Sequence, residues 1–114
     1  MSMRATSGLG AWTLQRLSAV YMIVFVVYAL IQYAMHESVS YTSWVSWVAH
    51  PFNNIAIGLL ILSLLAHAWV GARDIILDYV KPFYFRMMKL GVTAFLLIAM
   101  GLWALNILMN VAAI

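Results

Sequence analysis

The chain has 114 residues, of which 67% are hydrophobic and 8% are charged, and its mean hydropathy is +1.00. A soluble domain would carry about a quarter charged residues, so this composition excludes ordinary globular behaviour and indicates a membrane protein. The formal net charge of +3 comes from six basic and three acidic residues, too few and too scattered for nucleic-acid binding. The sequence has no cysteine, which excludes disulfides, thiolate-held iron–sulfur clusters and covalently attached haem on these residues.

Three apolar segments are long enough to cross a bilayer, which takes about 20 residues of helix. They run roughly over residues 11–35, 54–78 and 83–111. The sequence therefore predicts an all-α membrane protein with three transmembrane helices in a single membrane-anchor domain, residues 1–114. The first segment is longer than a signal-peptide core and no convincing cleavage site follows it, so we expect it to be retained. We therefore expect a multi-pass protein located in the bacterial inner membrane.

The second span has recognisable end signals. Pro51 fits the first turn of a helix, and Asn53 or Asn54 is a candidate N-cap. Pro82 disfavours helix at the preceding residue, Lys81, so it limits the span at its other end.

Basic residues set the expected orientation. None lies in the connection between the first two spans, residues 36–50, or in the C-terminal tail. With three spans, the N-terminus and the second turn share one side of the membrane, and all six basic residues fall there. The positive-inside rule makes this side cytoplasmic. The six residues are Arg4, Arg16, Arg73, Lys81, Arg86 and Lys89. On the opposite side, the 36–50 connection carries three aromatic residues typical of a membrane interface, Tyr41, Trp44 and Trp47.

Polar and small residues form one stripe along the second span. At about 100° per residue, the members of this stripe share a helix face. They are Ser63, His67, Gly71, Asp74 and Asp78. Lipid cannot satisfy polar groups, so we expect this face to meet protein or a cofactor. The opposite face carries Leu62, Leu65, Trp69, Ala72 and Ile76.

His67 is the main candidate functional residue because an imidazole at this depth needs a partner. The sequence leaves three roles open: a haem ligand, a histidine satisfied by a neighbouring helix, or a proton relay. His36 and His50 fall at the far interface, so a haem with two axial ligands would take the second one from another chain. Gly71, one turn away, either makes room for a flat ligand or allows close helix packing.

Five further residues lie toward the cytoplasmic side. Asp78 and Tyr79 are about 17 Å along the helix axis from His67, and a phenol can donate to a quinone carbonyl as that oxygen gains charge. Arg16 lies just inside the first span, where it either extends to the lipid headgroups or pairs with an anionic group such as a haem propionate. Arg73 and Asp74 fit a simple interfacial ion pair.

A run of residues on the second span resembles the smaller, D-type hydrophobic membrane-anchor subunit of bacterial succinate dehydrogenase. The run reads His67-x3-Gly71-x6-Asp78-Tyr79-Val80-Lys81-Pro82. The segment Gln15-Arg16-Leu17-Ser18-Ala19 is similar to the start of that family's first helix. The length, the three spans and the expected orientation fit as well, so the resemblance covers nearly the whole chain.

The resemblance implies a non-flavin subunit of complex II, the succinate:ubiquinone oxidoreductase of the tricarboxylic acid cycle and the respiratory chain. A flavoprotein subunit oxidises succinate and an iron–sulfur subunit carries the electrons to the membrane. A C-type anchor subunit joins this chain in a larger helix bundle, and the two hold a b-type haem and form the ubiquinone pocket. No activity is expected from the chain alone.

Site residues are implied by matching positions. His67 matches the axial ligand of the haem iron, and Tyr79 matches the tyrosine that hydrogen-bonds ubiquinone. Asp78 matches its neighbour in the quinone pocket, and Arg16 matches a position associated with the haem propionates. The resemblance implies no catalytic residue on this chain.

Three alternatives remain from the sequence. One is the anchor of a fumarate reductase or another quinone-linked dehydrogenase. Another is a transporter subunit that uses His67, Asp74 and Asp78 as a proton relay. The last is a purely structural anchor in which His67 only packs.

Overall fold

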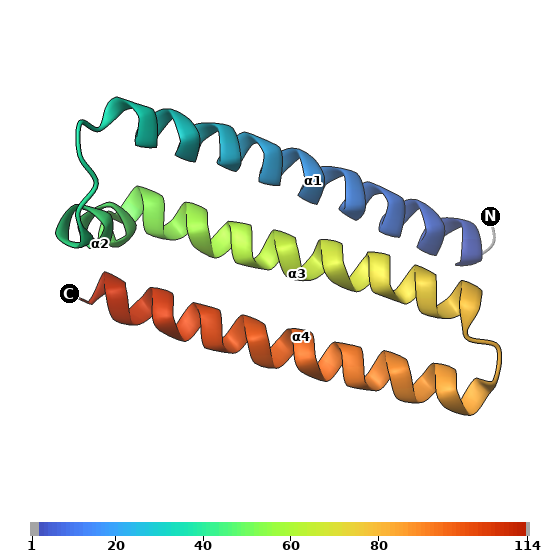
Figure 1. The fold of residues 1–114 in the computed structure, drawn as a ribbon. Helices are drawn as coiled ribbons and strands as arrows, with labels where there is room; N and C mark the ends of the chain where they lie inside the picture. Colours follow the sequence, from blue (N-terminus) through green and yellow to red (C-terminus); the bar gives the residue numbers. More distant parts are fainter. Residues whose placement is uncertain (1–2, 114) are drawn as a thin grey trace.

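In the computed structural model, the chain is described over residues 3–113 and its side chains over residues 9–113. This part of the chain forms four helices and no strand: α1 (Met3–Met35), α2 (Tyr41–Ala49), α3 (Pro51–Tyr79) and α4 (Phe83–Ala112) (Figure 1). The all-α prediction is therefore confirmed.

Three of the described helices are long and apolar enough to cross a membrane. The segments with this property are Leu9–Met35, Pro51–Tyr79 and Phe83–Ala112. They correspond to the three predicted spans, each extended by one to three residues where its bounds differ. Each span reaches the roughly 20 residues that a bilayer requires.

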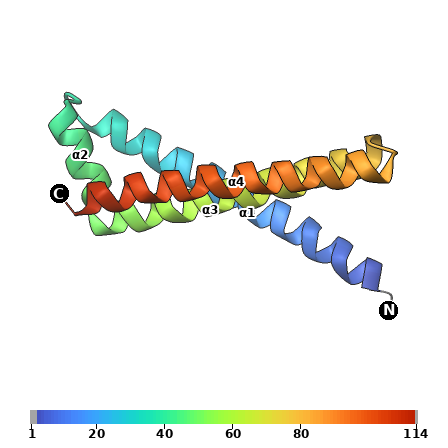
Figure 2. The ribbon, with the colours of Figure 1, turned by 90° about the horizontal axis from the view of Figure 1, so that it is seen from below.

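Helix α3 is the centre of the arrangement. It packs against α1 on one side and α4 on the other, whereas α1 and α4 make no contact within the described residues. Helices α3 and α4 run close together along their lengths, and α1 crosses them at an angle so that its ends diverge from the pair (Figure 2). Within the described residues, α1 therefore packs on the rest of the chain mainly through α3.

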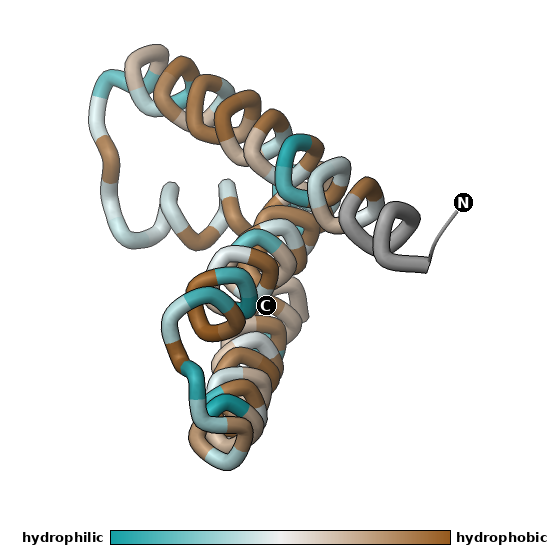
Figure 3. Tube along the Cα trace, turned by 90° about the vertical axis from the view of Figure 1, so that its right-hand side faces the viewer, coloured by the Kyte–Doolittle hydropathy of each residue, from teal (hydrophilic) through white to brown (hydrophobic). Residues whose placement is uncertain are grey.

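Little of the molecule is buried within this one chain. The buried hydrophobic side chains of the described region are Val48, Val70, Ile76 and Leu108. Apolar residues run through all the long helices, and polar residues lie mostly toward the helix ends and connections, with one polar stretch inside α1 (Figure 3). Exposed apolar surface on this scale marks contact with lipid or with other protein.

The basic residues cluster at one end of the molecule, as predicted. The N-terminal end of α1 and the α3–α4 turn lie at the same end, and α2 and the C-terminus lie at the other (Figure 1). Arg86 also has a structural role at this turn, since its Nε donates to the Val80 carbonyl at 3.1 Å. The side chain of Arg4 lies outside the described residues.

The connection between the first two spans contains a helix that the sequence did not predict. Ser40 caps α2: its Oγ accepts from the Ser43 amide at 3.1 Å, while the Ser40 amide donates to Ser43 Oγ at 2.9 Å. The rings of Trp44 and Trp47 stack with their centroids 6.0 Å apart. The reciprocal cap uses serine at the third helical position, where glutamate or glutamine is the usual signal.

The predicted asparagine cap of α3 is wrong. His50 is the N-cap and its Nδ1 accepts from the Phe52 amide at 3.2 Å, with Pro51 in the first turn as expected. Asn53 and Asn54 lie inside the helix, which begins at Pro51, and their side chains bond neighbouring segments. At the other end α3 stops at Tyr79, before Pro82, and the Val80 amide donates to the Ile76 carbonyl at 3.0 Å.

Polar side chains join the helix ends near α2. Tyr28 on α1 donates to Asn53 Oδ1 at 2.5 Å, and Asn53 Nδ2 donates to the Trp47 carbonyl at 2.9 Å. Asn54 Nδ2 lies 3.3 Å from the Val48 carbonyl and 3.2 Å from the Leu108 carbonyl. The two asparagines thus connect α3 to each of the other three helices.

Close packing with α4 covers the face of α3 opposite His67. Gly101 is buried, and a Cβ built on it would overlap the Cδ1 of Leu65. Leu65 belongs to the face predicted to lie opposite the polar stripe. His67 therefore points away from α4, toward α1.

Candidate functional site

His67 lies near the middle of α3 and meets two polar side chains of α1. Its Nδ1 is 3.1 Å from Ser18 Oγ, and its Nε2 is 3.3 Å from Gln15 Nε2. Both ring nitrogens are thus engaged across the α1–α3 contact. The expectation that this face of α3 meets protein holds at His67.

The two α1 residues form a small polar unit of their own. Gln15 and Ser18 are three residues apart, so they share a helix face. Ser18 is 4% exposed, and its hydroxyl donates to the Gln15 carbonyl at 3.0 Å. Gln15 Oε1 is buried and has no hydrogen-bond partner among the described residues. Sequence reasoning assigned neither residue a role, although two polar residues on one face of an apolar span were the available signal.

Gly71 lies one turn beyond His67 and faces the same helix. A Cβ built on Gly71 would sit 3.9 Å from Gln15 Nε2, which is ordinary van der Waals contact. Close packing within this chain therefore does not require a glycine here.

The acidic end of the stripe lies apart from His67. Asp74 and Asp78 are exposed, and Arg73 pairs with Asp74 at 3.4 Å, as the sequence suggested. Tyr79 is 79% exposed at the last residue of α3. These groups are accessible to a partner or ligand at the basic end of the molecule.

Arg16 projects from α1 on an exposed surface. Its guanidinium carbon lies 5.5 Å from the centre of the Trp12 ring, within the range of a cation–π contact. It is next to Gln15 in the chain, but it takes no part in the hydrogen bonds around His67.

No group of three or more His, Cys, Asp or Glu side chains in the described region could enclose a metal ion. A metal held by this chain through His67 would need further ligands from elsewhere.

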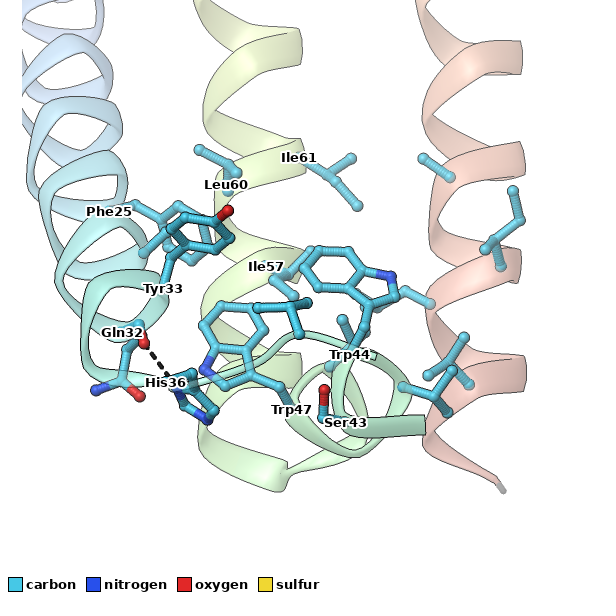
Figure 4. A pocket seen from close by; sticks show the side chains of 18 residues that line it. Phe25, Gln32, Tyr33, His36, Ser43, Trp44, Trp47, Ile57, Leu60 and Ile61 are labelled. Atoms are coloured by element: carbon cyan, nitrogen blue, oxygen red, sulfur yellow. Dashed lines mark hydrogen bonds between the residues drawn. The ribbon is translucent and has the colours of Figure 1, made fainter. Parts of the chain in front are cut away.

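A cavity of about 500 Å³ lies at the opposite end of the molecule, beside α2. Its lining is mainly apolar and includes Phe25, Tyr33, Trp44 and Trp47, with His36 at its edge (Figure 4). His36 Nδ1 donates to the Gln32 carbonyl at 2.7 Å. The cavity contains neither His67 nor Tyr79, so it is separate from the predicted site.

These features define a small membrane subunit with three spans and one histidine placed between two of them. The chain belongs to the succinate dehydrogenase/fumarate reductase transmembrane subunit family, whose sequence profile matches residues 1–108. It is 30% identical over 97 residues to the succinate dehydrogenase hydrophobic membrane anchor subunit of Coxiella burnetii (strain RSA 493 / Nine Mile phase I). The match covers 85% of this chain and 84% of that relative. The family predicted from the sequence is therefore confirmed.

Proposed function

We propose that this chain is the smaller hydrophobic anchor subunit of a bacterial succinate:ubiquinone oxidoreductase. The observation that carries the proposal is His67 in the middle of a membrane helix, with both ring nitrogens held by the neighbouring helix. In a member of this family, that arrangement fits an axial ligand to a shared b-type haem. Succinate is oxidised to fumarate on the soluble subunits while ubiquinone is reduced to ubiquinol in the membrane.

The residues around His67 fit such a group. Neutral imidazole is a common ligand for iron, and His67 Nε2 already faces a hydrogen-bond donor, the Gln15 amide at 3.3 Å. Coordination through Nε2 would take the place of that hydrogen bond. A bound b-type haem would supply a one-electron redox centre, and the C-type anchor subunit would provide its other protein ligand. Arg16, on the exposed surface of α1, would pair with the haem propionates.

Asp78 and Tyr79 would contribute to the ubiquinone pocket. The Tyr79 phenol is exposed and free to donate to a quinone carbonyl, and this hydrogen bond strengthens as the oxygen gains charge. Asp78 provides a carboxylate beside it that would accept a hydrogen bond or take part in proton delivery. Both residues lie at the end of the molecule where the basic residues gather.

The exposed apolar surface and the family membership support a proposal for the surroundings of the chain. Its apolar helices would sit in the bacterial inner membrane beside the C-type anchor subunit. The basic end would face the cytoplasm, where the iron–sulfur and flavoprotein subunits dock. This placement keeps the electron path from the iron–sulfur subunit to the quinone pocket short.

A fumarate reductase anchor is the nearest alternative, because the matched family includes both enzymes. The Coxiella relative favours the succinate dehydrogenase. The proton-relay alternative gains no support, since no hydrogen bond links His67 to Asp74 or Asp78 in the described structure. Both ring nitrogens of His67 are hydrogen-bonded to α1 instead.

Purification of the complex from native membranes, through a tag on this chain, tests the proposal. We expect flavoprotein and iron–sulfur subunits to co-purify, with succinate-to-ubiquinone turnover and the absorption spectrum of a b-type haem. A preparation without these subunits and without turnover would remove the dehydrogenase assignment.

Replacement of the histidine tests the ligand. We expect His67→Ala to lose most of the haem from the purified complex, measured by the absorbance of the reduced haem per flavin. The matched control is His36→Ala, which removes a histidine at the opposite end of the molecule and should keep the haem. Unchanged haem content in His67→Ala would exclude His67 as a ligand.

A further inference from the structure

We infer that Ser18 is a positioning residue for the haem ligand: its hydroxyl fixes the tautomer and orientation of His67, leaving Nε2 as the nitrogen that binds iron. The inference rests on the proposed function, because it concerns the same histidine. Ser18 would act through His67, without contact with the iron.

The hydrogen bonds around Ser18 determine which nitrogen carries the proton. A serine hydroxyl has one hydrogen and two acceptor lone pairs. Ser18 donates that hydrogen to the Gln15 carbonyl at 3.0 Å. With that hydrogen used, we assign Ser18 as the acceptor toward His67 Nδ1, 3.1 Å away, and the proton to Nδ1.

The other side of the ring is consistent with this assignment. In a neutral imidazole with a proton on Nδ1, Nε2 is the acceptor. Gln15 Nε2, 3.3 Å from it, is an amide nitrogen and can only donate. With the Gln15 amide nitrogen turned toward the ring, this contact fits the tautomer that the Ser18 hydrogen bonds assign, whose unprotonated nitrogen is the one able to coordinate a metal.

Burial makes the Ser18 contact effective. Ser18 is 4% exposed, so water does not compete for its hydroxyl. The charged groups on the same face of α3, Asp74 and Asp78, are exposed, and neither is hydrogen-bonded to His67 in the described region. A neutral hydroxyl is therefore the partner of Nδ1, in the position where metal-bound histidines usually donate to a carboxylate, carbonyl or water.

A purely structural role for Ser18 makes a different prediction. If the hydroxyl only satisfied the α1 backbone, its removal would change the amount of assembled complex but not the electronic state of the iron. If it positions His67, its removal changes both how firmly the haem is held and the haem's potential. An acceptor on Nδ1–H makes the imidazole a stronger donor to iron and favours the oxidised state.

The experiment compares Ser18→Ala and Ser18→Thr in the whole complex, with Ser63→Ala as the matched control. Ser63 lies one turn before His67 and makes no hydrogen bond to it in the described structure. Haem per flavin, haem midpoint potential and the low-spin electron paramagnetic resonance signal are measured on the assembled complex. We expect Ser18→Ala to bind haem about 10- to 100-fold more weakly, with a higher potential and a shifted signal. Ser18→Thr should restore all three values, and Ser63→Ala should leave them unchanged.

Two further comparisons keep the inference separate from assembly and from the haem assignment itself. Ser18→Val has the shape of Ser18→Thr without the hydroxyl, so equal haem properties in these two variants would overturn the positioning role. Wild-type haem properties in Ser18→Ala would do the same. If His67→Ala loses haem while Ser18→Ala is normal, only the role of Ser18 fails. If His67→Ala keeps its haem, the proposed ligand fails first.

Discussion

At the scale of single residues, Tyr79 gives the clearest separation of quinone chemistry from succinate oxidation. Its side chain is 79% exposed and lies about 17 Å along α3 from His67. We expect Tyr79→Phe to lower succinate-to-ubiquinone turnover by about 100-fold, the usual loss when one donor to a developing oxyanion is removed. Oxidation of succinate with an artificial dye acceptor should stay near the wild-type rate.

The control for Tyr79→Phe is another exposed tyrosine at the same end. Tyr84 is 88% exposed near the start of α4, and Tyr84→Phe should leave both activities unchanged. Equal loss of the two activities in Tyr79→Phe would indicate failed assembly instead of a lost hydrogen bond. Normal quinone reduction would exclude Tyr79 from the pocket.

Part of the candidate site could be predicted from the sequence, and part required the three-dimensional structure. His67 stands out because a lone imidazole in an apolar span is costly unless it has a partner. Its partners, Gln15 and Ser18, are 52 and 49 residues away in the chain. Their polarity was visible, but which face of α1 meets α3 depends on packing that no local pattern encodes.

At the scale of the helices, Asn53 connects α1, α2 and α3 through one buried carboxamide. It is 6% exposed, accepts from Tyr28 and donates to the Trp47 carbonyl. We expect Asn53→Leu to destabilise the chain by about 1–3 kcal/mol, because it leaves buried polar partners unpaired. Thermal unfolding of the complex in detergent measures this change.

A double-mutant cycle with Tyr28→Phe assigns the effect to the hydrogen bond. If Tyr28 and Asn53 stabilise each other, Asn53→Leu should cost less in the Tyr28→Phe background than in the wild type. Additive losses would show that the two side chains contribute independently.

The contact between α3 and α4 depends on Gly101. A side chain there would overlap Leu65, so we expect Gly101→Leu to lower stability by about 1–3 kcal/mol through overpacking. Gly91 lies on the same helix with nothing within 4 Å of a built Cβ, which makes Gly91→Leu the matched control. The unfolding temperatures of the two variants in the purified complex should differ, with the control near wild type. Equal temperatures would mean that α3 and α4 separate easily enough to accept the larger side chain.

The helices also show which elements and caps could be predicted from sequence patterns and which could not. The long spans were predictable because length and hydropathy alone identify them. Helix α2 has nine residues and its reciprocal cap is made by two serines, so neither its length nor its cap resembled a strong helix signal. The asparagines at the start of α3 resemble caps in sequence, yet they face other helices because α1 and α4 supply partners there.

At the scale of the whole molecule, the arrangement leaves one side of the α1–α3 contact unsupported by this chain. Helix α1 crosses α3 and makes no contact with α4 in the described structure (Figure 2). His67 lies in that crossing, bonded to α1. A partner helix packed beside α1 and α3 would therefore both cover exposed apolar surface and reach the proposed ligand.

The orientation in the membrane gives a prediction for the whole chain. The sequence has no cysteine, so single cysteines can be introduced without a background from this subunit. Lys81 lies in the basic α3–α4 turn and Glu37 lies in the connection before α2, and both are exposed at opposite ends of the molecule. Because basic connections stay in the cytoplasm, a membrane-impermeant maleimide applied to cells with a permeabilised outer membrane should label Glu37→Cys. It should label Lys81→Cys only in inverted vesicles, where the accessibility of the two sites should exchange. Labelling of Lys81→Cys from the outside would contradict the expected orientation and would place Tyr79 on the periplasmic side.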